Sequence, residues 1–142
     1  GPVADLLTRL DLPLAEAEDA EALFGATVVA HDSEYDLTQL QFAGGSVTVP
    51  GQACAVGQEV RLRIAARDVS LTLRAQEQTS ILNIFPATVA AIQALGTAQV
   101  TVRLLLGSEP LLARLTRKSA DTLGLQVGQN VFAQAKSVAL IT

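Results

Sequence analysis

The chain has 142 residues, 49% of them apolar, one cysteine and a formal net charge of −4. This length suits one compact domain or two small lobes that share a core, and no stretch approaches the ~20 apolar residues that span a bilayer. A single cysteine excludes an internal disulfide and fits a reducing compartment. We see no export leader, and the acidic balance argues against nucleic acid as the main partner.

Residues 1–23 are expected to be an acidic lead-in, with six acidic residues against Arg9. The leading Gly1-Pro2 resembles a protease-cleavage scar, so we expect the natural protein to continue upstream. Leu14–Leu23 is Ala- and Glu-rich with Pro13 before it, which fits a short helix or, equally well, a mobile linker. From Val60 onward nine basic residues face four acidic ones, so any anion site is expected in the second part.

The chain nearly repeats itself after the lead-in, and three sequence blocks return in the same order. The first block is identical at five of seven positions. Repeats of this kind indicate two copies of one small unit. The blocks are Phe24–Ala30 with Phe85–Ala91, Val56–Val60 with Val127–Val131, and Ala66–Leu71 with Ala135–Leu140.

Both copies consist of short apolar segments separated by Gly-containing turns. Side chains alternate between apolar and polar in Leu37–Phe42, as in a half-buried strand. Five short strands per copy predict small barrels that close to hide their edges. The fold class is therefore all-β: two tandem five-stranded OB-like barrels, a first subdomain at 24–76 and a second at 77–142. The expected strands are Ala26–His31, Leu37–Phe42, Val47–Val49, Val60–Ala65 and Val69–Arg74, then Thr88–Leu95, Ala98–Leu106, Leu111–Thr116, Asn130–Ala135 and Val138–Ile141.

The second copy carries an insertion, because 35 residues separate its first two blocks against 25 in the first copy. The extra ten correspond to Thr116–Leu125. They predict one short helix with Thr116 as N-cap and Gly124 as a left-handed terminator.

Several kinds of enzyme are excluded by missing motifs. The sequence has no G-x-x-x-x-G-K-[ST] phosphate loop, so this chain is not expected to hydrolyse ATP. His31 and Cys54 each stand alone, which leaves no zinc set and no Cys–His pair. Gly44-Gly45-Ser46 predicts a hairpin turn, and His31 an exposed or half-buried edge residue. We expect no catalytic residues and no metal site.

Hydroxyl and basic side chains gather at three points of the second copy: Thr79-Ser80, Thr116–Ser119 and Lys136-Ser137. Hydroxyl donors, helix N–H groups and a fixed positive charge suit a tetrahedral dianion. The alternative is structural: Thr116 and Ser119 cap a helix, Lys136 is a solvated turn residue and Ser80 ends a strand. The first copy has Arg67-Asp68 where the second has Lys136-Ser137, and the carboxylate of Asp68 would repel an anion.

Three motifs in register resemble molybdate-binding Mop domains. Gln78–Val89 is similar to their T-S-x-x-N-x-x-x-x-x-V opening and Leu115–Leu125 to their I-T-x-x-S-x-x-x-L-G-L helix. Val127–Val138 resembles their closing G-x-x-V…K-[AS]-[ST]-V. Upstream, Val60–Leu71 resembles the TOBE segment of transporter ATPases. The order of the two halves, with the match spanning about residues 3–142, is similar to the C-terminal regulatory region of molybdate-importer ATPases.

This resemblance implies a non-catalytic regulatory and dimerisation domain that binds molybdate or tungstate where Mop units meet. Its implied partners are a second copy, a nucleotide-binding domain and a membrane permease, at the cytoplasmic face of the inner membrane. One departure weakens tight binding: many Mop units have Arg where this chain has Leu82. The implied oxyanion contacts are Ser80, Asn83, Thr116, Lys118, Ser119, Lys136 and Ser137.

Two alternative functions remain. A structural dimerisation module without ligand is favoured by Leu82 and the apolar run Leu104–Leu106. A free-standing intracellular molybdate store is the other, although the acidic lead-in argues against it. A nucleic-acid-binding OB domain is the weakest reading, because it would want exposed aromatic residues on the barrel face.

Overall fold

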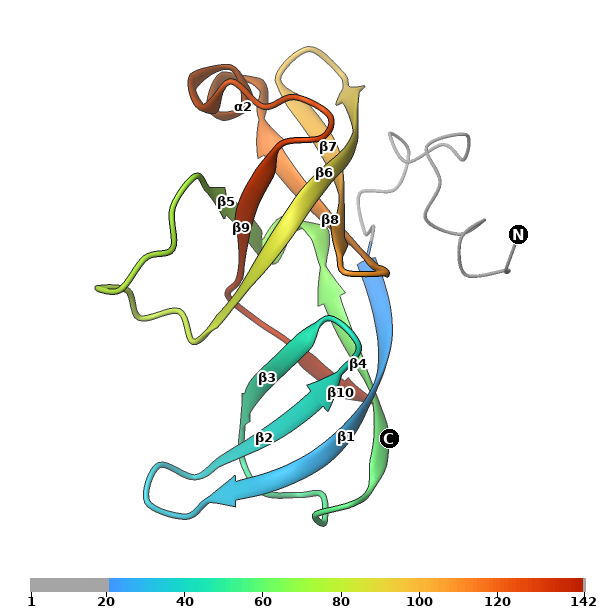
Figure 1. The fold of residues 1–142 in the computed structure, drawn as a ribbon, viewed down its shortest axis with the longest axis vertical. Coiled ribbons are helices and arrows are strands. Elements are labelled where there is room, and N and C mark those ends of the chain that lie inside the picture. Colours follow the sequence, from blue (N-terminus) through green and yellow to red (C-terminus); the bar gives the residue numbers. More distant parts are fainter. Residues whose placement is uncertain (1–20, 142) are drawn as a thin grey trace.

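The computed structural model describes residues 21–141, which form two stacked lobes of short strands (Figure 1). The expected all-β class is confirmed: there are two five-stranded OB-like barrels, with one helix inserted in the second. The strands are β1 (Glu21–Asp32), β2 (Leu37–Phe42), β3 (Gly45–Pro50), β4 (Glu59–Ala65), β5 (Val69–Thr72), β6 (Asn83–Leu95), β7 (Gln99–Leu106), β8 (Glu109–Thr116), β9 (Asn130–Ala135) and β10 (Ala139–Ile141). A 3-10 turn, η2 (Ala66–Asp68), precedes β5, and the helix is α2 (Arg117–Leu123).

The start of β1 corrects the end of the segment Leu14–Leu23, for which a short helix and a mobile linker are equally expected. Residues 21–23 are strand, because Ala22 and Phe24 are buried on alternate positions while Glu21 and Leu23 face out. This alternation has the strand period of two, and the segment pairs with β4 from Glu21↔Ala65 onward. The rest of that prediction, Leu14 to Ala20, lies outside the described residues.

The two copies exchange their last strands. The first sheet has the order β10-β4-β1-β2-β3 and the second β5-β9-β6-β7-β8. The chain therefore leaves the first barrel after β4, adds β5 to the second, and returns after β9 to add β10 to the first (Figure 1). The expectation that each barrel is built from the five strands of its own copy is wrong, and two crossing segments join the lobes.

The repeat reappears as matching backbone geometry. Val28 N–H donates to Gln58 O at 3.0 Å, and Val89 N–H donates to Gln129 O at 2.9 Å. Register shifts follow Val28 in β1 and Val89 in β6, which marks a β-bulge at the same place in both copies. A bulge increases local twist and so helps a short strand to curl around a small barrel.

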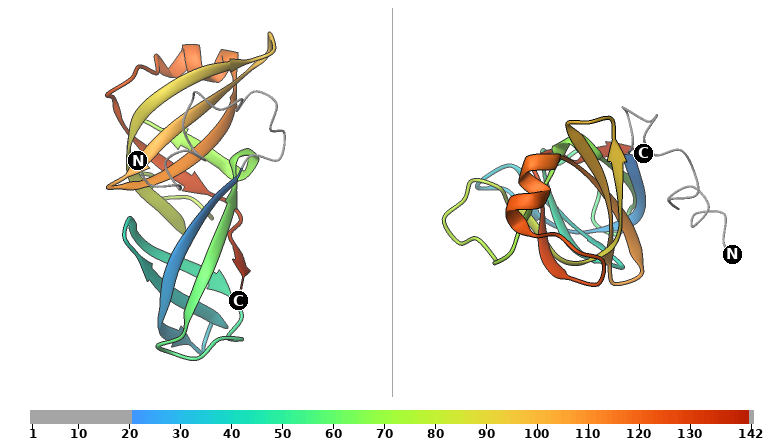
Figure 2. Two further views of the ribbon diagram at one scale, coloured as in Figure 1. Left: turned by 90° about the vertical axis from the view of Figure 1, so that its right-hand side faces the viewer. Right: turned by 90° about the horizontal axis from the view of Figure 1, so that it is seen from above.

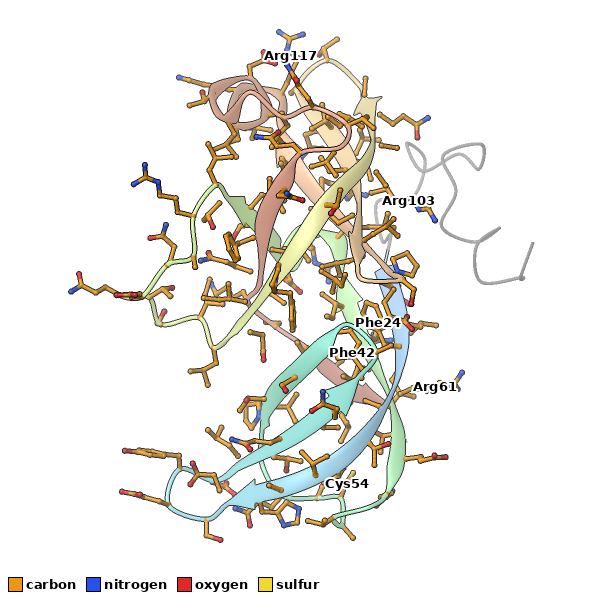
Figure 3. All side chains as sticks on the ribbon, in the orientation of Figure 1. Phe24, Phe42, Cys54, Arg61, Arg103 and Arg117 are labelled. Atoms are coloured by element: carbon orange, nitrogen blue, oxygen red, sulfur yellow. The ribbon has the colours of Figure 1, made fainter. Side chains whose placement is uncertain are left out.

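One hydrophobic core runs through both barrels, and aromatic rings bridge their junction. The ring centroids of Phe24 and Phe42 are 5.1 Å apart, and those of Phe42 and Phe85 are 5.7 Å apart. Figure 3 shows Phe24 and Phe42 between the lobes, and Figure 2 shows the lobes one above the other. Because Phe85 belongs to the second barrel, the hydrophobic contact ties the lobes together in addition to the crossing segments.

The β2–β3 turn also belongs to this junction. The hairpin turn expected at Gly44-Gly45-Ser46 is present but begins one residue earlier, at residues 43–44, and Gly45 already starts β3. A Cβ on Gly44 would lie 2.7 Å from the Phe42 ring and 2.8 Å from Leu106 Cβ, so the absence of a side chain lets the turn pack on β7. No helix among residues 21–141 is long and apolar enough to cross a membrane.

Candidate functional site

The second crossing segment lines a hollow of about 600 Å³ between the barrels. We call it the crossing pocket. Its walls come from β3 and the start of β2, from the loop before β6, and from the segment between β9 and β10. The lining residues are Leu37, Thr48, Val49, Pro50, Ser80, Ile81, Leu82, Asn83, Ala135, Lys136, Ser137 and Val138.

Four of the seven predicted contact residues line this pocket: Ser80, Asn83, Lys136 and Ser137. Backbone hydrogen bonds position two of them, Ser80 and Lys136. Ile81 N–H donates to Thr79 Oγ1 at 3.1 Å, which makes a tight turn that presents Ser80. Lys136 N–H donates to Asp68 O at 2.9 Å, which pairs the two crossing segments. Sequence positions that are more than fifty residues apart thus meet because the chain crosses between barrels.

The electrostatic character of the crossing pocket is positive. Among residues 21–141, Lys136 is the only charged residue in its lining, and no acidic side chain of that range contributes. Ser80, Lys136 and Ser137 are exposed, and within residues 21–141 their side chains have no hydrogen-bond partner. Two hydroxyl groups and one ammonium group are therefore available as donors, as binding of an oxyanion requires.

Asn83 differs from the other three because its carboxamide is already engaged. Its Oδ1 accepts from Thr48 N–H at 2.8 Å, and its Nδ2 donates to Thr48 O at 2.9 Å. The side chain is 8% exposed. It joins the start of β6 to the outer edge of β3, so it shapes the pocket wall.

The other three predicted contacts, Thr116, Lys118 and Ser119, lie at the start of α2, at the far end of the second barrel (Figure 1). The predicted cap is confirmed: Thr116 Oγ1 accepts from Ser119 N–H at 3.0 Å and donates to Ser119 Oγ at 2.9 Å. Gly124 ends the helix at φ 62°, as expected. Figure 3 shows Arg117 pointing outward beside this turn. Within one chain the predicted contact residues therefore form two separate groups, one at the crossing pocket and one at the start of α2.

The two isolated residues have structural surroundings. His31 is exposed at the end of β1, and its Nε2 lies 2.6 Å from Cys54 O. Cys54 is a buried free thiol. Within residues 21–141 no three His, Cys, Asp or Glu side chains gather into a set that could hold a metal ion.

The pocket contains features that the sequence does not reveal. Thr48 and Pro50 of the first copy form one wall, and no motif connects them with the loop before β6. Ile81 and Leu82 add an apolar side, and Leu82 is 65% exposed. These residues come together where the two barrels meet, and a local sequence pattern does not specify that contact.

Comparison with known proteins agrees with this architecture. Residues 79–142 match the model of the TOBE domain. A solved structure described as the cytoplasmic molybdate-binding protein ModG, in a form with molybdate bound, superposes with a TM-score of 0.73 at 25% identity and covers 84% of this chain and 94% of that one. Residues 79–142 of the chain are therefore similar to the TOBE domain, and the two-barrel fold is similar to that of ModG.

Relatives that match nearly the whole chain are molybdenum import ATP-binding proteins. The chain is 55% identical over 141 residues to the molybdenum import ATP-binding protein ModC of Albidiferax ferrireducens, and 51% identical over 142 residues to that of Hahella chejuensis. Each match covers 99% of this chain but only 38% and 40% of the relative. The chain thus spans about two fifths of the length of these ModC proteins.

Proposed function

We propose that the chain is a non-catalytic regulatory and dimerisation domain of a molybdate importer ATPase and binds molybdate or tungstate. The observation that carries this is the crossing pocket, where Ser80, Lys136 and Ser137 offer donors and no acidic side chain of residues 21–141 is part of the lining. Similarity to ModC proteins and to molybdate-bound ModG supports the choice of oxyanion.

The chemistry of the proposed site follows from its donors. A tetrahedral dianion has only acceptor atoms, so hydroxyl groups and an ammonium group bind it while a carboxylate repels it. Lys136 supplies the charge, and Ser80 and Ser137 supply directional hydrogen bonds. Leu82 stands beside them where a further cation would strengthen binding, so we expect modest affinity.

A second copy of the chain would complete the site. Thr116, Lys118 and Ser119 lie far from the crossing pocket in one chain, so they contact the same oxyanion only if another copy presents its α2. Binding across such a homodimer would favour one arrangement of the copies. High molybdate would then slow transport by the attached nucleotide-binding domains and permease, at the cytoplasmic face of the membrane, through its differential affinity for two states.

Calorimetric titration of the 142-residue chain with molybdate, tungstate and sulfate tests the proposal. We expect saturable heat with molybdate and tungstate, and a loss of about tenfold in affinity for Lys136→Ala, the weight of one charged hydrogen bond. Arg61→Ala is the matched control, because Arg61 is an exposed cation of β4 outside the pocket. Absence of heat from every anion at millimolar concentration would contradict the proposal.

The second candidate is a dimerisation module that needs no ligand. The exposure of Leu82 favours it, because a partner surface would remove this side chain from water. Sedimentation of the chain with and without molybdate separates the two. A dimer of equal strength in both conditions supports the structural module, and a dimer strengthened by molybdate supports the sensor.

A further inference from the structure

The Asn83 carboxamide occupies an open sheet edge of the other barrel. β3 is the outermost strand of the first sheet, and β10 lies at the opposite edge. Thr48 pairs with Gln39 on one side, and on the other its N–H and C=O meet only a side chain, that of Asn83. The carboxamide therefore takes the place of one residue of a neighbouring strand and protects the edge.

Asn83 is also flanked by the anion-binding groups. Ser80 lies three residues before Asn83, in the loop that leads into β6. The backbone of Asn83 pairs with that of Ala135 in the β6–β9 ladder, and Ala135 directly precedes Lys136 and Ser137. A ligand that holds Ser80, Lys136 and Ser137 would therefore restrict both segments that support Asn83.

Only the second copy has a side chain that binds the sheet edge of the other barrel in this way, within residues 21–141. In the alignment of the repeat, Ala22 of β1 stands where Asn83 stands in β6, and a methyl group offers no hydrogen bond. The first copy thus has no corresponding clamp on the edge of the second barrel, where β5 packs beside β8.

We propose that Asn83 is a positioning residue that couples the crossing pocket to the first barrel. This inference rests on the proposed function. An oxyanion held by Ser80, Lys136 and Ser137 stabilises the Asn83–Thr48 pair and so rigidifies the β3 edge. Asn83 itself keeps both amide hydrogen bonds to Thr48 and does not exchange them for the ligand.

Hydrogen exchange at the Thr48 amide reads this coupling directly, because its N–H is the donor to Asn83. An opening that requires ligand release is suppressed about 100-fold when free ligand is a hundredfold above Kd. In the uniformly labelled 142-residue chain with molybdate at that level, we expect Thr48 exchange to slow by at least about fivefold, since only part of its exchange needs such an opening. Ala55 is the control amide: it donates to Gln58 Oε1 at 3.1 Å, away from the pocket. Its rate should stay unchanged.

Two variants separate positioning from direct contact. Asn83→Ala should leave molybdate binding measurable, speed Thr48 exchange about tenfold in the free chain by removing its acceptor, and make that exchange insensitive to molybdate. Asn130→Ala is the matched control, because Asn130 bonds the Thr88 hydroxyl on β6 at 3.3 Å and lies outside the pocket. It should behave as wild type in both measurements.

Each failure has a distinct appearance. If molybdate binds to the wild-type chain and Thr48 exchange does not change, the coupling is wrong while the proposed function stands. If molybdate does not bind to the wild-type chain, the proposed function fails and this inference fails with it. If Asn83→Ala abolishes binding while Thr48 exchange in the wild type ignores the ligand, Asn83 is a direct contact. Should Asn83→Ala not fold, the wild-type exchange result alone decides.

Discussion

The two barrels share a backbone plan and differ in the chemistry at their crossings. Corresponding backbone hydrogen bonds have the same length in the two copies: Gly57 N–H donates to Val28 O, and Gly128 N–H donates to Val89 O, both at 2.7 Å. Both glycines have a φ of 91°. The duplicated unit therefore kept the bulge and turn that close a barrel, and changed side chains elsewhere.

The crossings show what changed. Beside Arg67 and Asp68 lies a hollow of about 230 Å³, which Glu21, Arg63 and Ser137 also line, against about 600 Å³ for the crossing pocket. In the repeat, Asp68 corresponds to Ser137 and Glu21 to Leu82. Two carboxylates thus stand in the first copy where the second has a hydroxyl and an apolar side chain. Within residues 21–141 the smaller hollow sets these two carboxylates against the guanidinium groups of Arg63 and Arg67, whereas the crossing pocket has one ammonium group and no carboxylate in its lining, so an anion meets less repulsion at the second crossing.

The largest expected effect concerns the junction between the barrels, where the β2–β3 turn of the first barrel packs on β7 of the second. Gly44→Ala places a Cβ within 3.0 Å of Leu106 O as well as against Phe42, so backbone must move. We expect a loss of about 3 kcal/mol in the free energy of unfolding, at the upper end for overpacking. Urea denaturation followed by circular dichroism measures it.

Gly107 in the corresponding β7–β8 turn is the control for that substitution. A Cβ there meets nothing within 4 Å, but φ is +64°. Gly107→Ala should therefore cost only about 1 kcal/mol, from the left-handed backbone. Equal losses in the two variants would show that the turns are equivalent and that Gly44 does not pack between the barrels.

The second prediction converts the second crossing into the first. Ser137→Asp introduces the carboxylate that Asp68 has in the first copy, next to Lys136. Loss of a donor together with repulsion of the anion should weaken molybdate binding by about 2 kcal/mol, or about 30-fold. Calorimetry measures the change, and Ser137→Asn, a neutral variant of similar size, is the control. Equal affinities for the two variants would mean that the oxyanion does not approach residue 137.

The sequence predicts the barrels well because their determinants are local. Alternation in Leu37–Phe42 and the turn at Gly44 need only neighbouring residues, and β2 has the predicted bounds. The Thr116 cap and the Gly124 terminator are likewise written within ten residues of sequence.

The sequence does not predict which strands pair across the two copies, because that pairing depends on where the chain crosses between the barrels. Residues 69–74 read equally well as a strand of either barrel, because strand pattern does not specify a partner. The pairing of Val69 with Ala135 therefore could not be foreseen, nor could the bond between Asn83 and Thr48, which lie 35 positions apart in different copies. The division of the predicted contacts has another cause, because the start of β6 and the end of β9 lie at one end of the second barrel and α2 lies at the other (Figure 1).

The third prediction concerns α2, the helix that, within residues 21–141, only the second barrel has. Thr116→Ala removes the acceptor for Ser119 N–H and should lower the free energy of unfolding by about 1 kcal/mol, as loss of an N-cap usually does. Thermal unfolding measures it. Thr116→Ser keeps the cap and is the control. In the monomeric chain neither variant should alter exchange at Thr48, because α2 is remote from the crossing pocket; a change there would show that the two groups of predicted contacts communicate within one chain.

The smallest expected effect comes from adding a positive charge at the second crossing, at the position that carries a negative charge in the first copy. Leu82→Arg places a guanidinium where Glu21 stands in the first copy. Because position 82 is 65% exposed, solvent screens the new charge, and we expect a gain in molybdate affinity of about 0.5 kcal/mol. The gain should shrink between 0.05 and 0.5 M salt, as the Debye length falls below the distance over which exposed charges interact. Leu82→Gln, of similar length without charge, is the control. If Gln gives the same gain at every salt concentration, removal of the apolar side chain is the cause, and charge at this position does not distinguish the two crossings.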